Sequence, residues 1–228
     1  MFDIDSPSAP RRSFLGRLAG GVAALLAGGA SAVAAEPRVM PGPLAVEDEW
    51  LQKLHGQYRQ FFDAMSFNDA FPLIFAYNWA VTMRVTYKIP ASEVTPVVGL
   101  RHMGIAPAFN DAIWKKYKFG EFFKINDPKT KAPATRNFAN SAAAGDLNFP
   151  GAAVSELVQG GGVVTVCKLA TVIVSRMAAS AAGLKVAPQD AYDEWVANML
   201  PGTYLVPSGV LAVHRAQAVG KCTYCFSG

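Results

Sequence analysis

The pattern of apolar and polar positions alternates between strand-like and helix-like segments along most of the chain. Short apolar runs predict five strands, at 57–65, 94–105, 163–167, 203–209 and 221–228. Apolar positions at helical spacing predict helices between them, at 72–88, 110–123, 152–159, 171–183, 187–200 and 210–220. Strands that alternate with helices are typical of a mostly parallel sheet. The sequence therefore predicts an α/β fold, with a mostly parallel five-stranded sheet flanked by helices on both faces.

The amino-terminal segment has a different pattern. PRRSFLG at 10–16 precedes a run rich in glycine, alanine and leucine and then the small residues SAVAAEP. An arginine pair before a weakly apolar stretch and a cleavage site such as Ala32-Val33-Ala34 is typical of a twin-arginine secretory signal, although Pro10 and Gly16 depart from its usual residues. An uncleaved anchor is the weaker alternative, because the run is shorter than the ~20 apolar residues that a spanning helix needs. We expect residues 1–35 to be a twin-arginine signal peptide and the protein to be periplasmic.

The remaining chain has the length of one ordinary domain. PRVMPGP belongs to an expected extended lead-in over 36–56, and the α/β domain is expected over 57–228. The polar, turn-rich segment at about 126–145 predicts a surface excursion or a partner-facing insertion. No other run is long and apolar enough to predict a membrane span after signal cleavage.

Charge and motifs argue against several function classes. The formal net charge is +4, and the basic residues do not form the cluster that nucleic-acid binding needs. A serine-hydrolase function is not indicated, because the sequence lacks a G-x-S-x-G elbow. A nucleotide-binding loop is not indicated either, because GGG precedes a strand instead of opening a helix after one.

Cys167 ends the predicted strand 163–167 and precedes a predicted helix. Ligands and reactive groups of open α/β sheets gather beyond the carboxyl ends of the strands. The amino end of the next helix would favour a thiolate there, and Lys168 would add to this effect if it points the same way. Only the thiolate attacks sulfur. The alternative is a buried structural cysteine.

Cys222 and Cys225 form a CxxC near the end of the chain. A haem site would need histidine where Phe226 stands, and a zinc site would need two further ligands. An oxidising compartment favours a disulfide or a dithiol redox pair, although a regular strand would point the two thiols to opposite faces. Three states remain open: a local disulfide, a redox or metal pair working with Cys167, and free or intermolecular thiols.

His102 is expected at the same edge of the sheet as Cys167, where it could orient or deprotonate a thiol. A hydrogen-bonded packing role is the alternative. His214 is expected to be solvated or to face a partner. Arg101 and Arg136 are candidates for binding an anion such as a sulfur oxyanion, although their spacing does not require it.

Three segments resemble the DsrE/DsrF-like proteins, which include sulfur-relay subunits and the YchN-like oligomers: LRHMGI, GGGVVTVCKLA and LPGTYLVPSGVLAVHRAQAVG. The resemblance covers about 57–226, and Met103 departs from the family's His-Gly turn. It implies the family's α/β fold, with Cys167 as the sulfur-accepting cysteine. It also implies oligomers, since family members commonly form dimers, trimers or hexamers.

Two functions follow as expectations. In the first, the protein is a periplasmic sulfur-handling or thiol-redox protein that meets a sulfur-donor or thiol-redox partner protein and needs no cofactor or metal. Its expected site residues are Cys167 and His102 as catalytic residues, Arg101 and Lys168 as substrate-binding residues, and Cys222 and Cys225 as a redox pair or disulfide. In the second, the protein is a non-catalytic binding or assembly subunit that forms a homo-oligomer through helices rich in aromatic residues.

Overall fold

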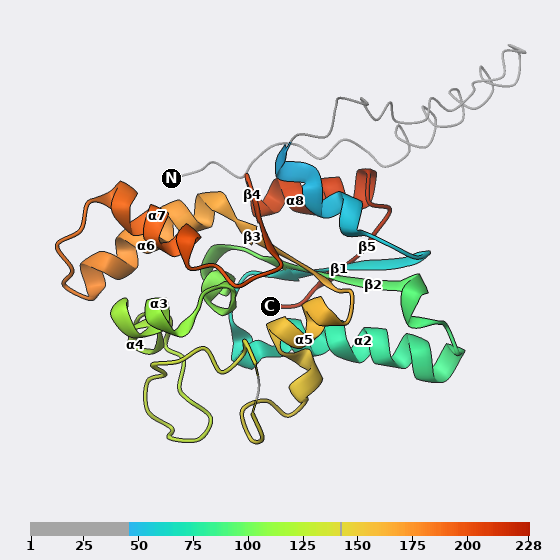
Figure 1. Cartoon of the computed structure of the whole chain (residues 1–228), viewed down its shortest axis with the longest axis horizontal. Coiled ribbons are helices and arrows are strands. Elements are labelled where there is room, and N and C mark those ends of the chain that lie inside the picture. The colour runs from blue at the N-terminus through green and yellow to red at the C-terminus, as the bar shows by residue number, and fades with distance from the viewer. Residues whose placement is uncertain (1–45, 142) are drawn as a thin grey trace, which may run out of the picture. The chain divides into compact units, whose positions relative to one another are not determined.

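The protein forms a five-stranded parallel sheet with the strand order β4-β3-β2-β1-β5. The computed structural model describes residues 46–141 and 143–228 (Figure 1). The strands are β1 (Tyr58–Ala64), β2 (Val94–Leu100), β3 (Val163–Cys167), β4 (Thr203–Val206) and β5 (Thr223–Phe226). The predicted α/β fold class is therefore confirmed, and every strand pair is parallel.

Helices cover both faces of the sheet. Figure 1 shows α8 and the 3-10 helix η1 (blue) on one side and α2 and α5 on the other. The α-helices are α2 (Phe71–Tyr87), α3 (Asp111–Lys116), α4 (Phe119–Phe123), α5 (Val154–Gln159), α6 (Lys168–Ala181), α7 (Pro188–Ala197) and α8 (Gly209–Ala218). The 3-10 helices are η1 (Val46–Lys53), η2 (Asn68–Ala70), η3 (Ala91–Glu93), η4 (His102–Ala108) and η5 (Pro150–Ala152).

The core has two parts, one on each face of the sheet. The larger part includes a group of fully buried aromatic rings, in which Trp195 lies 4.7 Å from Phe119 and 4.9 Å from Phe109 between ring centroids. The smaller part joins Trp50 of η1 to Phe61 of β1 and to α8. Because the two parts cover opposite faces, all residues of β2 and β3 are buried. This explains why both strands are continuous apolar runs in the sequence.

The end of the expected lead-in is not extended. Residues 46–53 form η1, and Trp50, Leu51 and Leu54 are buried in the smaller core. The prediction was wrong here because these apolar side chains are spaced to pack on one side of a helical turn. The expected signal peptide, residues 1–35, lies outside the described residues.

Two predicted elements are interrupted at residues with a positive φ. The strand predicted over 94–105 ends at Leu100, because His102 adopts a φ of +51° and starts η4. Gly104 then passes very close to Ala64. A Cβ atom on residue 104 would lie 2.5 Å from the Ala64 carbonyl oxygen. The helix predicted over 110–123 is divided into α3 and α4 at Lys118, which has a φ of +49°.

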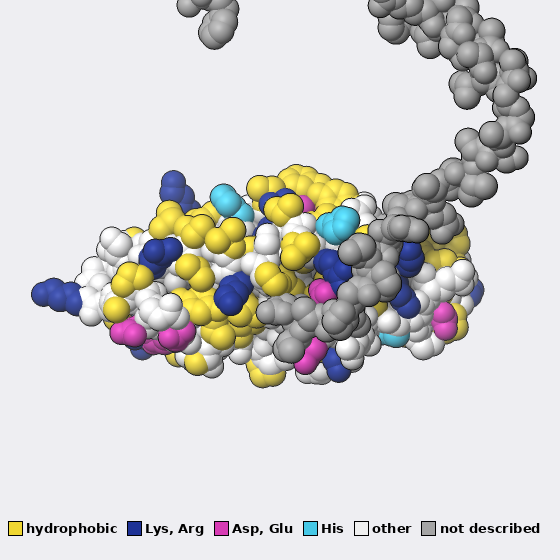
Figure 2. Space-filling view, turned by 90° about the horizontal axis from the view of Figure 1, so that it is seen from above, with side chains coloured by type: hydrophobic (Ala, Val, Ile, Leu, Met, Phe, Trp, Pro, Cys, Tyr) yellow, Lys and Arg dark blue, Asp and Glu magenta, His cyan; other side chains and the backbone are white. Residues whose placement is uncertain are grey.

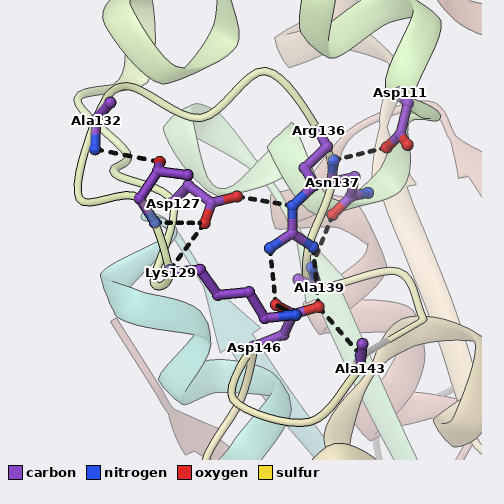
Figure 3. A network of polar contacts seen from close by, with 10 residues as sticks. Asp111, Asp127, Lys129, Ala132, Arg136, Asn137, Ala139, Ala143 and Asp146 are labelled. Carbon is purple, nitrogen blue, oxygen red and sulfur yellow. Dashed lines mark hydrogen bonds and ion pairs between the residues drawn. The ribbon is translucent and has the colours of Figure 1, made fainter.

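Charged groups close the segment 126–145 on itself, and the Asn137 N–H donates to the Asp111 carboxylate of α3 at 2.7 Å (Figure 3). The Arg136 Nε lies 2.7 Å from Asp127, and its two terminal nitrogens lie 2.8 and 2.7 Å from Asp146. Both carboxylates are buried, and Phe138 and Ala139 belong to the larger core. The segment therefore contributes to the core, whereas its polar sequence predicts a surface excursion or a partner-facing insertion. Arg136, which we considered for anion binding, is already held by two carboxylates.

Candidate functional site at the carboxyl edge of the sheet

The carboxyl ends of β2, β3 and β4 meet at one edge of the sheet. Leu100 pairs with Val166, and Cys167 pairs with Val206. This register places the residues after β2 beside Cys167, so the expected common edge of His102 and Cys167 is confirmed. A pocket of about 360 Å³ opens there, lined by Arg101, His102, Met103, Cys167, Leu169, Ala170, Ile173, Val174, Met177, Ser208, Gly209 and Val210.

Cys167 lines this pocket and is also the N-cap of α6. Its Sγ accepts a hydrogen bond from the Ala170 N–H at 3.3 Å, and the residue is only 6% exposed. Serine, threonine, aspartate or asparagine usually fills this position, because an oxygen can accept a free helix N–H. Here sulfur accepts it. The N–H and the helix dipole both stabilise negative charge on the sulfur atom.

Arg101 is held at the same edge by a buried carboxylate. Its Nε and Nη2 donate to the two oxygens of Asp63 at 2.6 and 2.8 Å, and Asp63 is 1% exposed. The Tyr224 hydroxyl donates to the same carboxylate at 2.9 Å. These hydrogen bonds to Asp63 raise the pKa of Arg101, and attraction to Asp63, Tyr224 and Cys167 raises it further. Arg101 is therefore a fixed positive charge beside the thiol.

The amino end of α8 completes the polar side of the pocket. Gly209, its first residue, packs so close to Arg101 that a Cβ would lie 2.5 Å from the Arg101 Cβ. Ser208 is the N-cap of α8, but its side chain makes no capping hydrogen bond. It lines the pocket instead. Ser208, Arg101 and Cys167 thus line one small pocket.

The other expected site residues have different positions. His102 is exposed at the rim of the pocket, and among the described residues no hydrogen bond joins it to Cys167. Lys168 is exposed and does not line the pocket. The structure therefore brings Arg101, His102 and Cys167 to one pocket, whereas Lys168 does not contribute to it.

An apolar wall of the pocket was not recognised in the sequence. Leu169, Ile173 and Met177 follow each other at intervals of four residues along α6, and they are 55%, 44% and 50% exposed. Met103 and Val210 add apolar surface from η4 and α8. The spacing of four residues was the available signal. Figure 2 shows hydrophobic side chains gathered on the face of the molecule toward which α8 lies in Figure 1, with lysine and arginine side chains among them.

Cys222 and Cys225 lie away from this pocket. All three cysteines of the described chain are free thiols. Cys222 is buried in the smaller core, whereas Cys225 packs against the larger core on the opposite face. β1 and β2 separate β5 from β3, a lateral distance of about 14 Å at ~4.8 Å per strand. Within one chain the pair is therefore not in contact with Cys167, and its expected redox function stays a prediction.

Comparisons of the chain with protein-family models, curated proteins and solved structures found no match. The likeness to DsrE/DsrF-like proteins therefore rests on the three sequence segments quoted above. Among residues 46–141 and 143–228, no helix is long and apolar enough to cross a membrane.

Proposed function

We propose that the protein handles sulfur through Cys167, which takes up a sulfane sulfur atom or exchanges with a disulfide partner. The observation that carries this proposal is the position of the Cys167 sulfur. It accepts the Ala170 N–H at the start of α6 and faces a pocket that contains Arg101. Both groups favour negative charge, and a thiolate is the form that attacks sulfur.

The chemistry needs no group beyond a thiol and a sulfur donor. The Cys167 thiolate attacks the outer sulfur of a persulfide R–S–SH, a new S–S bond forms, and the bond between the two donor sulfurs breaks. The leaving thiolate R–S⁻ takes a proton from solvent. Arg101 lines the same pocket, and its positive charge would favour the negative charge on the reacting sulfurs. His102 also lines this pocket and is exposed, and among the described residues no hydrogen bond joins it to the thiol.

The sequence of the first 35 residues supports a location for this chemistry. Its arginine pair, weakly apolar stretch and small-residue cleavage site favour export by the twin-arginine route. We therefore propose a periplasmic site of action, where sulfur donors or thiol-redox partner proteins would meet the folded domain.

A second candidate is a non-catalytic assembly subunit. The observation that favours it is the exposed apolar surface on α6 and α8, where Leu169, Val210 and Leu211 are all exposed. Apolar surface of this kind is typical of protein interfaces. A homo-oligomer formed through this surface would cover the pocket.

Site-resolved alkylation of the native protein distinguishes the two candidates. We expect iodoacetamide to modify Cys167 without unfolding, at a rate far above that of Cys222, whose pKa is raised to about 11 by burial. We also expect pretreatment with polysulfide to block this modification. The readout is peptide mapping by mass spectrometry, with Cys167→Ser as the matched control. Modification of Cys167 only after denaturation, together with an oligomer in sedimentation analysis, would support the assembly subunit instead.

A further inference from the structure

The pocket beside Cys167 is a groove with polar lining residues and one long apolar wall. The polar lining residues include Cys167, Arg101 and Ser208. The wall runs along α6 from Leu169 to Met177, a length of about 12 Å at ~1.5 Å per residue. The groove therefore continues well beyond the space that a sulfur atom alone would need.

The exposure of the side chains differs between the thiol and the apolar wall. Cys167 is 6% exposed, whereas Leu169, Ile173 and Met177 are 55%, 44% and 50% exposed. A molecule that reaches the sulfur atom can therefore lie against the exposed wall of α6. A pocket of about 360 Å³ accepts a small molecule with a single chain.

We propose that the sulfur donor for Cys167 is a small organic persulfide or disulfide with an unbranched apolar chain, which lies along Leu169, Ile173 and Met177. This inference rests on the proposed function and names the class of its substrate. In the persulfide reaction, the Cys167 thiolate bonds to the outer sulfur and the alkyl thiolate leaves. In the disulfide reaction, a mixed disulfide with the alkyl chain forms and the other half leaves as a thiolate that solvent protonates.

Burial of the alkyl chain of the donor would make the site selective for apolar donors. Each methylene group that leaves water for an apolar surface favours binding about fourfold when it is fully buried. Small hydrophilic donors, such as inorganic polysulfide or cysteine persulfide, would react at Cys167 but leave the α6 wall in water. Alkyl donors are therefore favoured in rate over hydrophilic donors of equal reactivity.

The test uses methyl, butyl and octyl methanethiosulfonate as probes. Each transfers its alkylthio group to a thiolate and releases methanesulfinate, so the chemistry is constant and only the chain length changes. We expect the second-order rate constant of Cys167 in the native protein to rise about tenfold or more from methyl to octyl, relative to the same ratio for N-acetylcysteine in solution. Peptide mapping assigns the modification to Cys167.

Two matched variants distinguish an effect of the α6 wall from the effect of adding a charge elsewhere on the surface. Ile173→Asp places a charge on the α6 wall, and we expect it to lower the octyl rate about fivefold or more while the methyl rate stays within about twofold. Val85→Asp makes the same change on α2 at a residue that is 61% exposed and does not line the pocket. It should change neither rate.

Three other outcomes would overturn the inference, and the measurements tell them apart. An octyl-to-methyl ratio equal to that of N-acetylcysteine, or an octyl rate unaffected by Ile173→Asp, would show that Cys167 is reactive but that the groove does not bind the chain. No modification by the methyl probe would overturn the proposed function as well. Rates that rise on dilution of an oligomer would show that a second copy of the chain fills the groove.

Discussion

Asp63 and Arg101 fix the geometry of the candidate site at the scale of single residues. The two side chains lie 38 residues apart in sequence, and two hydrogen bonds join them at the edge where β1 and β2 end. Tyr224 adds a third hydrogen bond to the carboxylate from β5. A buried carboxylate with these partners keeps the guanidinium in one orientation beside Cys167.

We expect Arg101→Ala to lower the free energy of unfolding by about 3–5 kcal/mol, because it leaves the buried Asp63 carboxylate without its cation. Urea denaturation followed by tryptophan fluorescence measures this loss. Arg176→Ala is the matched control, since Arg176 is exposed and forms no ion pair within the described residues. It should cost less than about 1 kcal/mol. An equally small loss for Arg101→Ala would contradict this account of the site.

Cys222 is expected to be unreactive in the native protein. Burial raises the pKa of its thiol from an ordinary 9.0 to about 11. The thiolate fraction near neutral pH therefore falls about 100-fold, since each tenfold change corresponds to one pKa unit. We predict that iodoacetamide modifies Cys225, which is half-buried, long before Cys222. Peptide mapping over a time course measures both rates, and equal rates would be inconsistent with the buried position of Cys222.

At the scale of elements, ion pairs hold the segment 126–145 together. Asp127 accepts the backbone N–H groups of Lys129 and Thr130, and Arg136 joins Asp127 to Asp146. Hydrogen bonds from Arg136 lower the pKa of Asp146 despite its burial. In the folded protein this carboxylate therefore stays ionised at a pH where the unfolded chain already binds a proton.

Acid should therefore weaken this segment. The pKa of Asp146 is lower in the folded state, so its stabilising contribution is present above the unfolded pKa near 4 and is lost as the pH falls below it. We expect Asp146→Asn to lower the free energy of unfolding by about 3 kcal/mol at pH 7 and by clearly less at pH 3. Urea denaturation at both pH values is the measurement. Glu121→Gln, at an exposed residue of α4, should show little loss at either pH.

The elements that were predictable from sequence are those whose burial produces a recognisable run or spacing of apolar residues. β2 and β3 are buried on both faces and appear as apolar runs. The end of β2 left no such pattern, because it depends on the positive φ of His102. The start of α6 was also missed by three residues, since a thiol, and not a usual oxygen, caps it. Leu169 consequently fell outside the predicted helix, and the apolar wall was not recognised.

The candidate site was predictable only in part for a similar reason. Parallel strands place their carboxyl ends at one edge, so the order of strands and helices was sufficient to bring His102 near Cys167. The pairing of Asp63 with Arg101 depends on the register in which Asp63 lies opposite Gly99. No local pattern in the sequence encodes that register, because it results from the packing of the whole sheet.

At the scale of the whole molecule, the two parts of the core share one sheet. Trp50 lies in the smaller part, and Trp114 and Trp195 lie in the larger part. β1 and β3 contribute side chains to both parts. Loss of either part should therefore remove support from the other, and unfolding should be cooperative.

We predict that tryptophan fluorescence and the protection of Cys222 against alkylation are lost at the same urea concentration. Fluorescence reports mainly on the larger core through Trp114 and Trp195, whereas Cys222 reports on the smaller core. Pulse alkylation at each urea concentration, read by mass spectrometry, gives the second transition. Exposure of Cys222 well before the change in fluorescence would show that the face covered by η1 and α8 unfolds independently.

The proposed chemistry of Cys167 is tested most directly by the intact mass of the folded protein after exposure to polysulfide. We predict that wild-type protein gains one sulfur atom on Cys167, that reduction removes it, and that Cys167→Ala gains none there. Peptide mapping assigns the added mass among the three cysteines. If Cys167 remains unmodified in the folded protein while Cys225 reacts, Cys167 is a structural N-cap of α6, and the proposed sulfur-handling function is contradicted.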